Sequence, residues 1–391
     1  MPSRRQGYEG IAVCVPVTVP YSRYSIKSAH WFCGRALADL IRVSGVSKHD
    51  IDGYCISSFT LAPDTAVGLT QHLGVSPRWL DHIPMGGASG VIALRRAARA
   101  VQAGDAEIVA CIGADTNHVD TFRQTVATFS QFANDAVYPY GSGGPNSSFA
   151  FLTDHYMREF GAQREDFGRL CIAQRENALP VPHAMMKRPL TMEQYLEARV
   201  IAEPLRLFDC VMPCAGAEAY FVMTVDRAKS LGLTYATILS TIERHNAFPD
   251  DPIQYRGGWA MDIDEFYDEA GVGPGDIDFL QAYDDYPVIC FMQIEDLGFC
   301  AKGEAPAFVR DHDLTTNGDF PFNTSGGQLS AGQAGAGGGY IGVVETLRQF
   351  TNQTLGNVVE DAHNGLVSCF GMINYDRGLC TAAAILRRSA L

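Results

Sequence analysis

The chain has 391 residues, 47% of them hydrophobic, which is enough apolar material for two sizeable cores. Its formal net charge of −14 disfavours a polyanionic partner such as nucleic acid. We find no apolar window of about 18 residues and no signal-peptide pattern. We therefore expect a cytoplasmic protein that does not associate with membranes.

The eleven cysteines are scattered through apolar runs. They form no CxxC pair and no Cys/His spacing that suits zinc, so no metal site is expected. We expect most of them to be buried, reduced thiols.

The first half of the chain predicts alternating strands and helices. A strand over 11–17 comes first, and a helix then ends at Gly45, which acts as its C-terminal cap. Another helix begins at Gly86-Gly87, and a strand over 107–113 follows it. Apolar residues recur along this helix at helical spacing: Val91, Leu94, Ala97, Ala98 and Val101.

Residues from about 117 to 207 fit no such pattern. They mix loop-like sequence with helical segments near 149–160 and 192–201. We interpret this stretch as an excursion that covers the mouth of an active site, and a purely structural insertion is the alternative. Its aromatic residues suit a roomy apolar pocket or a core equally: Phe122, Phe129, Phe132, Tyr138 and Tyr140.

The second half of the chain repeats the first. Segment 266–284 matches segment 40–58, with Gly271 in the place of Gly45. Downstream, Gly326-Gly327 is predicted to open a glycine-rich helix that extends to Leu347, and strands over 365–370 and 380–386 follow. Two βαβ-rich halves of the same design are predicted, with sheets that sandwich helices.

This organisation resembles the thiolase superfamily over essentially the whole chain. Five motifs resemble its sterol-carrier and lipid-transfer branch, and the closest pattern is that of bacterial aldolases that shorten steroid side chains attached to coenzyme A. The motifs are Tyr138-Pro-Tyr-Gly, Ile201-Ala-Glu-Pro-Leu-Arg-Leu-Phe-Asp-Cys, Tyr283-Asp-Asp-Tyr, Asp296-Leu-Gly-Phe-Cys-Ala-Lys-Gly-Glu and Asn323-Thr-Ser-Gly-Gly-Gln-Leu.

The resemblance implies an α/β thiolase fold, in which two duplicated βαβαβαββ halves form an αβαβα layered sandwich. The first half would span 1–228, with a loop domain inserted at about 117–207, and the second half 229–391. The resemblance also implies a homodimer that binds acyl-coenzyme A, and a small zinc-ribbon/OB-fold partner subunit. Coenzyme A would be part of the substrate, and no other cofactor is expected.

Two groups that a thiolase needs are missing. A thiolase uses a thiolate at a helix N-terminus, a histidine that activates it and a second cysteine. By the resemblance, the thiolate position falls on Gly87 and the histidine position on Gln333. The amide of Gln333 can donate hydrogen bonds but is no base, and the aldolase branch carries Tyr there. We interpret the nearby Ser89 as a helix-start residue, because no general base is adjacent to it.

Two other residues are candidates for the chemistry. Tyr283 lies where the aldolase branch also has Tyr, and it could be a base if its phenolate is stabilised; packing under a loop is the alternative. Cys369 matches the second cysteine in its Cys-x-Gly loop, and could act as acid/base or line the acyl pocket. Asp284 and Asp285 could equally be solvated residues at a strand end. The predicted substrate-binding residues are Gly86, Asp284, Asn323, Gly326, Gly327 and Gly371.

These residues leave three functions open. In the first, a β-hydroxyacyl-coenzyme A is cleaved by a retro-aldol reaction, with Tyr283 as base or proton relay. Backbone N–H groups near Gly86-Gly87, with Gln333, would hold the enolate oxygen. In the second, Cys369 performs acyl transfer, thiolysis or hydrolysis. The third is non-catalytic binding of acyl-coenzyme A or scaffolding. We prefer the first because it requires no covalent nucleophile.

Overall fold

A computed structural model describes residues 6–120, 139, 141 and 144–389. The five aromatic residues of the insertion named above lie outside this part of the chain. The eleven cysteines lie inside it, and all are free thiols. Nine of them are buried, as predicted.

The first half of the chain alternates strands and helices as expected. Its elements are β1 (Ile11–Ser22), α1 (Ala29–Ser44), β2 (Gly53–Ser57), α2 (Ala66–Leu73), β3 (Trp79–His82), α3 (Ser89–Ala103), β4 (Ile108–Asp115), β7 (Ala215–Thr224) and α9 (Val225–Ser230). The predicted boundary between residues 228 and 229 falls within α9.

The second half repeats this order with additional helices. Its elements are β8 (Tyr235–His245), α10 (Trp259–Ala270), β9 (Phe279–Ala282), α11 (Pro287–Asp296), α12 (Ala305–Asp311), α13 (Gly327–Ala331), α14 (Ile341–Phe350), β10 (Asn364–Asn374) and β11 (Arg377–Arg388). The predicted glycine caps are confirmed: Gly45 ends α1 with φ 70° and Gly271 ends α10 with φ 64°. Positive φ is the backbone region in which glycine carries no steric cost.

The strands show that the duplication extends to the sheet topology. The order is β3-β2-β4-β7-β1-β8-β11-β10-β9, so the two halves meet at β1 and β8. In each half an antiparallel strand, β7 or β11, lies between the first strand and a parallel pair. The counterpart of β3 is reduced to an isolated parallel bridge between Leu280 and Phe322.

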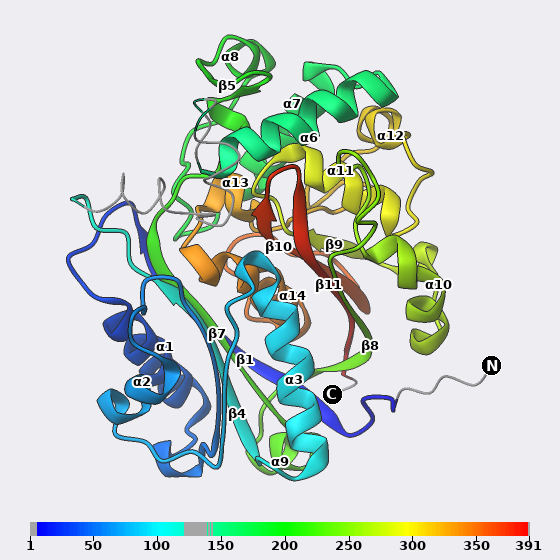
Figure 1. Cartoon of the computed structure of the whole chain (residues 1–391). Coiled ribbons are helices and arrows are strands. Elements are labelled where there is room, and N and C mark those ends of the chain that lie inside the picture. The colour runs from blue at the N-terminus through cyan, green and yellow to red at the C-terminus, as the bar shows by residue number, and fades with distance from the viewer. Residues whose placement is uncertain (1–5, 121–138, 140, 142–143, 390–391) are drawn as a thin grey trace.

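The two predicted sheets share one continuous strand ladder. β1 and β8 pair in antiparallel fashion over Ala12 to Cys14 only, and Val15 then has φ 58°. Beyond this point the two halves of the ladder diverge and face each other across α3 and α14 (Figure 1). The ladder therefore behaves as two sheets in a layered structure.

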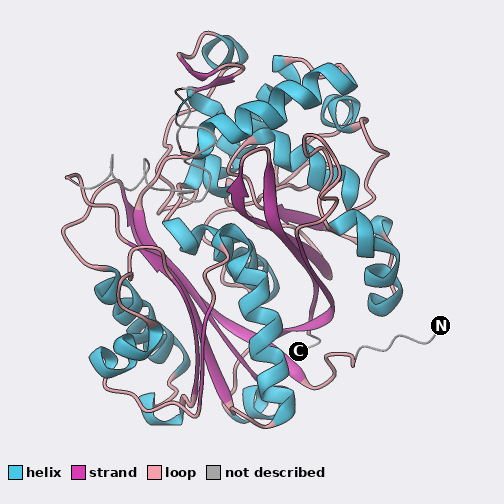
Figure 2. Ribbon diagram, in the orientation of Figure 1, coloured by secondary structure: helices cyan, strands magenta, loops and turns pink. Residues whose placement is uncertain are grey.

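Helices fill the space between the sheets and cover both outer faces (Figure 2). In the middle layer, Val91 of α3 and Leu347 of α14 share a core with Tyr220 of β7 and Val367 of β10. α1 packs on the outer face of the first-half strands, and α10 and α11 pack on that of the second half. The predicted αβαβα arrangement is confirmed.

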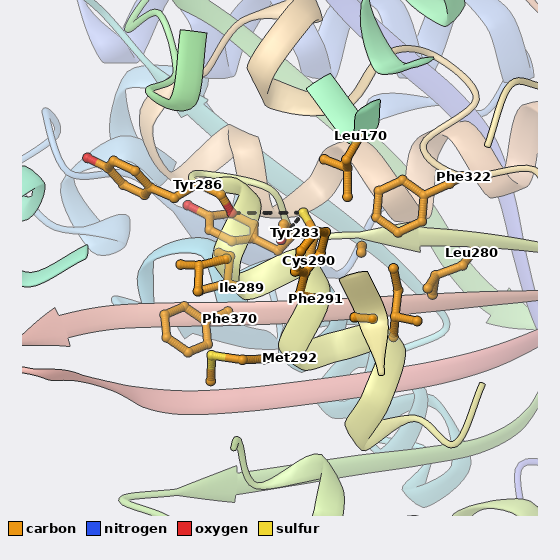
Figure 3. Packing of buried hydrophobic residues seen from close by; sticks show 14 of the residues in the cluster. Leu170, Leu280, Tyr283, Tyr286, Ile289, Cys290, Phe291, Met292, Phe322 and Phe370 are labelled. Atoms are coloured by element: carbon orange, nitrogen blue, oxygen red, sulfur yellow. Dashed lines mark hydrogen bonds between the residues drawn. The ribbon is translucent and has the colours of Figure 1, made fainter. Parts of the chain in front are cut away.

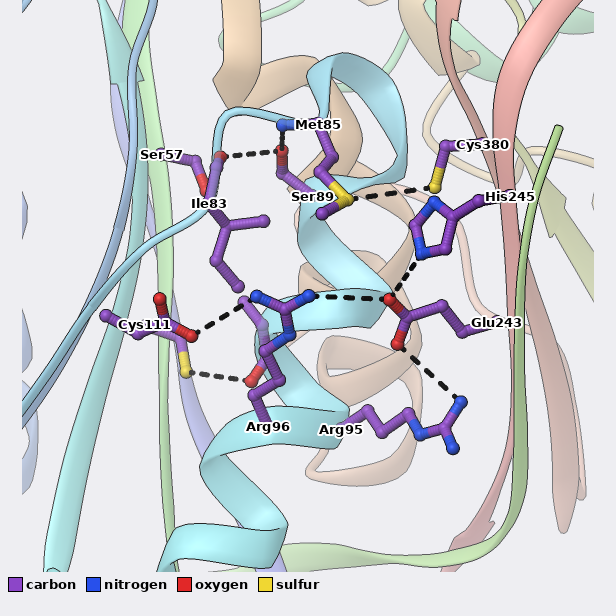
Figure 4. A network of polar contacts seen from close by, with 12 residues as sticks. Ser57, Ile83, Met85, Ser89, Arg95, Arg96, Cys111, Glu243, His245 and Cys380 are labelled. Carbon is purple, nitrogen blue, oxygen red and sulfur yellow. Dashed lines mark hydrogen bonds and ion pairs between the residues drawn. The ribbon is translucent and has the colours of Figure 1, made fainter.

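Charged residues anchor α3 between the two sheets. Arg96 lies 3.4 Å from Asp81 of β3 and 3.5 Å from Glu243 of β8. Arg95 lies 3.6 Å from the other oxygen of Glu243. Figure 4 shows Glu243 as the meeting point of these contacts, with His245 beside it. This network fixes the helix whose N-terminal end reaches the candidate site.

The predicted long helix from Gly326 to Leu347 is wrong in one respect, because the chain breaks within it. α13 ends at Ala331, Gly332 has φ 111°, and a 3₁₀ helix, η7 (Gly335–Tyr340), precedes α14. At the break the main chain of Gln333 bonds with Met212 and Cys214, at 2.9 and 2.8 Å. These two bonds hold Gln333 outside any helix.

The described part of the insertion packs over the second half. It comprises α6 (Pro145–Phe160), α7 (Arg164–Ala178), α8 (Met192–Leu196), β5 (Val200–Ala202) and β6 (Leu205–Arg206). α6 and α7 contact α11, where the rings of Phe167 and Phe291 stack at 4.7 Å. The predicted helix over 192–201 is shorter than expected and gives way to β5.

Two of the resemblance motifs supply buried anchors. Asp209 lies 2.7 Å from Arg164 and accepts a 2.7 Å hydrogen bond from the main chain of Arg206. Lys302 lies 3.0 Å from Glu295 and 2.5 Å from Asp296. Charges this deeply buried are tolerated when they are paired. Among the described residues, no helix is both long and apolar enough to cross a bilayer.

Candidate active site

A cavity of about 330 Å³ lies where the two halves and the insertion meet. Its lining is mostly apolar, with a small number of polar side chains, as in many small-molecule sites. The first half contributes Phe59, Thr60, Gly86, Gly87 and Asp115, and Val211 lies just after the insertion. The insertion contributes Asn117, Asn146, Phe149, Arg199 and Leu207. The second half contributes Tyr283, Asp285, Tyr286, Gln333, Phe370, Gly371 and Met372. The insertion therefore does border a cavity, as we interpreted it.

At the place of the missing nucleophile, Tyr283 fills the space beside Gly87. A Cβ atom on Gly87 would lie 2.0 Å from Cζ of Tyr283 and 2.4 Å from the main-chain oxygen of Phe370. No side chain can be accommodated at such distances. The Tyr283 ring can therefore occupy this position only because residue 87 is glycine and not cysteine.

Tyr283 belongs to a hydrogen-bonded group with Gln333 and Asp285. Nε2 of Gln333 donates to the hydroxyl oxygen of Tyr283 at 3.2 Å and to Oδ1 of Asp285 at 2.5 Å. Tyr283 and Asp285 also interact through their side chains. We call these three residues the tyrosine–aspartate–glutamine group. Both amide hydrogens of Gln333 are used within it, so the predicted donation from Gln333 to an enolate oxygen is not what this geometry provides.

The connection between β9 and α11 places the acidic and phenolic members. It runs from Tyr283 to Tyr286, at the C-terminal end of β9, and Pro287 starts α11. Figure 3 shows Tyr283 and Tyr286 near each other and close to Phe370. Tyr286 is held by a 2.5 Å hydrogen bond from its hydroxyl to Asn146, and its ring stacks on Phe149 at 3.9 Å.

Burial sets the protonation of this group. It raises the pKa of the Asp285 carboxyl to about 8, and the neighbouring Asp284 adds to this rise, while hydrogen bonds from Tyr283 and Gln333 oppose it. Burial, with the nearby Asp285 carboxylate, raises the pKa of Tyr283 well above its usual value. This raised pKa disfavours the phenolate base and favours the proton relay, the other role that we expected for Tyr283.

Comparisons with known proteins agree with this fold. The family described as thiolase C-terminal domain-like matches residues 259–382. A steroid side-chain-cleaving aldolase of Thermomonospora curvata is 30% identical over 364 residues, which cover 89% of this chain and 92% of that protein. The chain belongs to the thiolase superfamily, in its aldolase branch.

Two further similarities span this thiolase-superfamily protein almost completely. The 17-hydroxy-3-oxo-4-pregnene-20-carboxyl-CoA lyase of Mycobacterium tuberculosis is 28% identical over 362 residues, covering 88% of this chain and 92% of the lyase. The solved structure titled Ltp2-ChsH2(DUF35) aldolase has a TM-score of 0.83 at 26% identity, covering 97% of this chain and 98% of that one. The predicted family and fold are confirmed.

Cys369, the one thiolase group that we predicted to be retained, does not reach the cavity of this thiolase-superfamily protein. Its side chain belongs to the middle layer, where Sγ lies 3.5 Å from the main-chain oxygen of Gly339. Burial raises the pKa of its thiol to about 12. This placement and the raised pKa disfavour the acid/base or nucleophilic role that we expected for Cys369.

Asp284 also points away from the cavity, so its predicted substrate-binding role is corrected. Its carboxylate accepts main-chain hydrogen bonds from Gln328 at 2.8 Å and Leu329 at 3.2 Å, and a side-chain hydrogen bond from Nε2 of Gln174 at 3.0 Å. It thereby caps α13. Asp284 is buried, and its expected solvated position is wrong.

Of the glycine and asparagine residues predicted to bind substrate, some line the cavity and others do not. Gly86, Gly87 and Gly371 line the cavity. Asn323, Gly326 and Gly327 do not. Oδ1 of Asn323 accepts a 2.8 Å hydrogen bond from the main chain of Ala282. Gly327 packs directly against Asp284, since a Cβ on Gly327 would lie 2.1 Å from its carboxylate.

Ser89 has the structural role that we predicted. It is the first residue of α3, and its hydroxyl donates to Ile83 at 3.1 Å and accepts from Met85 at 3.3 Å (Figure 4). Asp115, which sequence analysis did not single out, lines the cavity. Its carboxylate accepts hydrogen bonds from Thr60 at 2.7 Å and from the main chain of Ala336 at 2.7 Å, and so joins the two halves.

Asp285 is the site residue that sequence reasoning missed. We regarded it as a possible solvated strand-end residue, but its side chain is partly buried and lines the cavity. The signal for its burial is the apolar sequence on both sides, Phe279 to Ala282 and Pro287 to Met292. A carboxylate between two such runs is shielded from water.

Proposed function

We propose that this protein cleaves a carbon–carbon bond of a β-hydroxyacyl-coenzyme A by a retro-aldol reaction. The observation that carries the proposal is the exclusion of any side chain at Gly87 by the ring of Tyr283. This exclusion removes covalent acyl transfer at the thiolase position while keeping a hydroxyl there. Retro-aldol chemistry needs a base and a site for the enolate oxygen, and no nucleophile.

The enolate oxygen would lie against the main chain of the first half. Gly86 and Gly87 line the cavity just before α3, a helix of 15 residues. The N-terminus of a helix directs N–H groups and a partial positive charge toward an anion. Preorganised donors of this kind stabilise charge that develops in a transition state. We assign Gln333 to positioning Tyr283 and Asp285 instead.

The acyl group is proposed to be bulky and apolar, as in a steroid or an aromatic side chain. The lining of the cavity supports this, because Phe149, Tyr286, Phe370 and Met372 surround the polar group. The named relatives act on steroid substrates, and the lyase is named for a coenzyme A thioester. Coenzyme A would enter as part of the substrate.

The proposed assembly is a homodimer with a small zinc-ribbon/OB-fold partner subunit, as the resemblance implies. It is supported by the similar solved structure, whose title names a second component with a DUF35 domain. Size measurement of the chain alone, and after co-expression with a DUF35 protein from the same genome, tests both parts. A cytoplasmic location remains an expectation.

The assay uses a panel of β-hydroxyacyl-coenzyme A thioesters with steroid, aromatic and short aliphatic β-substituents, including 17-hydroxy-3-oxo-4-pregnene-20-carboxyl-CoA. We expect a shortened acyl-coenzyme A and a carbonyl product in equal amounts, detected by chromatography and mass spectrometry. The chain is tested alone and with the DUF35 partner. Absence of cleavage across the panel in both forms would contradict the proposal and favour acyl-coenzyme A binding or scaffolding.

Acyl transfer through Cys369 is the alternative that this geometry disfavours most. The thiol lies outside the cavity and is neutral. Intact mass after incubation with an acyl-coenzyme A should therefore show no adduct. A stable adduct that disappears in Cys369→Ala would instead support the acyl-transfer reaction.

A further inference from the structure

Asp285 differs from its neighbour Asp284 in what its carboxylate does. Asp284 satisfies main-chain N–H groups and caps a helix. In the part of the chain that the structure describes, the hydrogen bonds of Asp285 come from two side chains of the cavity, Gln333 and Tyr283. A partly buried carboxylate that accepts no main-chain hydrogen bond lowers stability and supports no local structure. Such groups concentrate at functional sites.

The position of Asp285 suits proton transfer. It lines the cavity together with Tyr283, so both are available to a bound substrate. Gln333 bonds to both at once and fixes their relative orientation. A carboxylate and a phenol held side by side can exchange a proton without moving.

We propose that Asp285 is the general base of this protein, and that Tyr283 relays the proton between the substrate hydroxyl and the Asp285 carboxylate. The inference rests on the proposed retro-aldol function. The resemblance places Tyr at position 333 in the aldolase branch, so the pairing of Asp285 with Gln333 is a departure of this chain. The carboxylate takes over a proton-transfer task for which a phenol with a raised pKa is poorly suited.

The step balances without any further reactant. The Asp285 carboxylate removes the β-hydroxyl proton through Tyr283, and the O–H electron pair forms the carbonyl of the released ketone or aldehyde. The bond between the α and β carbons breaks, and its electron pair passes to the thioester as an enolate. The proton held on Asp285 then returns to the α carbon. The products are a carbonyl compound and a shortened acyl-coenzyme A.

Several titratable or charged groups face Asp285. Tyr283, Asp284 and Tyr286 flank it in the chain, and Cys290 of α11 interacts with it electrostatically. Asp115 of β4 and Arg199 of the insertion line the same cavity. Asp284 raises the pKa of Asp285, and the hydrogen bond from Gln333 lowers it. Activity should therefore rise with pH as the Asp285 carboxyl, of pKa about 8, loses its proton.

The first experiment compares wild type with Asp285→Asn on the cleaved member of the panel. We expect kcat to fall by about 100-fold or more, because general-base catalysis contributes this much. The pH dependence should be lost in the variant. Asp154→Asn is the matched control, since Asp154 is half exposed on α6 and pairs with Arg158. It should keep the wild-type rate and pH profile.

The second experiment uses Gln333→Leu, which removes the hydrogen bond that lowers the pKa of Asp285. The rise of kcat/KM should move to higher pH, which a merely structural role of Gln333 would not produce. A companion infrared titration in the absence of substrate should show a protonated carboxyl that disappears near pH 8 in wild type and is missing in Asp285→Asn.

The outcomes separate the two proposals. If wild type cleaves no thioester of the panel, the proposed function fails and this inference fails with it. If wild type cleaves but Asp285→Asn retains its rate and pH profile, Asp285 is not the base and the retro-aldol function stands. A circular dichroism spectrum equal to that of wild type establishes that Asp285→Asn is folded.

Discussion

The two halves of the molecule share one topology but contribute different things to the cavity. The first half lines the cavity with the main chain of Gly86 and Gly87, which have no side chains to fill it. The second half supplies the side chains that can transfer protons, Tyr283 and Asp285. The comparison teaches that a duplicated scaffold can lose the nucleophile of its first half and keep its layers intact.

The largest effect is expected when a side chain is introduced at Gly87 in the first half. Gly87→Ala places a Cβ 2.0 Å from Tyr283 and should lower kcat by about 1,000-fold or more. Overpacking should also destabilise the fold by about 1–3 kcal/mol. Turnover and thermal unfolding measure the two effects.

The double variant Gly87→Ala with Tyr283→Ala serves as the control for that clash. It should recover only part of the thermal stability lost in Gly87→Ala, because the ring is gone but the main-chain oxygen of Phe370 still lies 2.4 Å from the new Cβ, and it should remain inactive. A Gly87→Ala protein with normal turnover would refute the exclusion that underlies the proposed function.

Removing one hydroxyl from the second half should have the next largest effect. Tyr283→Phe keeps the ring against Gly87 and deletes the proton relay. We expect kcat to fall by about 100-fold with little change in thermal stability. Steady-state kinetics with the DUF35 partner present measures the change, and an unaltered kcat would exclude Tyr283 from the reaction.

The stability cost of the Asp285 carboxylate gives a smaller effect with a definite sign. In the folded protein its pKa is about 8, whereas the ordinary value is 3.8. The folded state therefore binds the proton more tightly, and stability falls as pH rises from about 4 to about 8. Asp285→Asn lacks this ionisation and should be more stable than wild type by about 1–3 kcal/mol at pH 8.

Thermal unfolding of both proteins at pH 5 and pH 8 tests this expectation. The gain from Asp285→Asn should shrink at pH 5, where the wild-type carboxyl is already neutral in the folded state. An equal gain at both values would mean that the ionisation of Asp285 is not its cause.

The smallest effect on turnover is expected from a substitution of Cys369, because this residue, unlike Tyr283 and Asp285, does not line the cavity. Cys369→Ala leaves a small void in the middle layer and should cost about 1 kcal/mol of stability. Turnover should change by less than about twofold, because the thiol lies outside the cavity. A large loss of kcat with retained stability would return Cys369 to the mechanism.

The fold was readable from sequence because its signals are local and repeated. The glycine caps at Gly45 and Gly271, and the apolar periodicity of α3, lie within short windows. The break before η7 was missed because it depends on main-chain hydrogen bonds from Gln333 to Met212 and from Cys214 to Gln333, and Met212 and Cys214 are far away in the chain. The joining of β1 to β8 is likewise a long-range contact.

The site was only partly readable for the same reason. The missing nucleophile at Gly87 and the positions of Tyr283 and Gln333 followed from aligned motifs. Which of two adjacent carboxylates faces the cavity depends on side-chain direction, and the sequence Asp284-Asp285 does not specify it. The three-residue Cys-x-Gly match at Cys369 similarly says nothing about the face of β10 on which the thiol lies.

The central place of β1 in the strand ladder bears on how this chain folds during synthesis. β1 pairs with β7 and with β8. Ile11 therefore cannot pair until its partner Thr224 in β7 has been synthesised. At typical translation speeds of about 5–20 residues per second, the first strand remains without its partners for about 10–40 s. Apolar strands exposed for that time are prone to aggregation, so expression yield should depend on chaperone supply and on growth temperature.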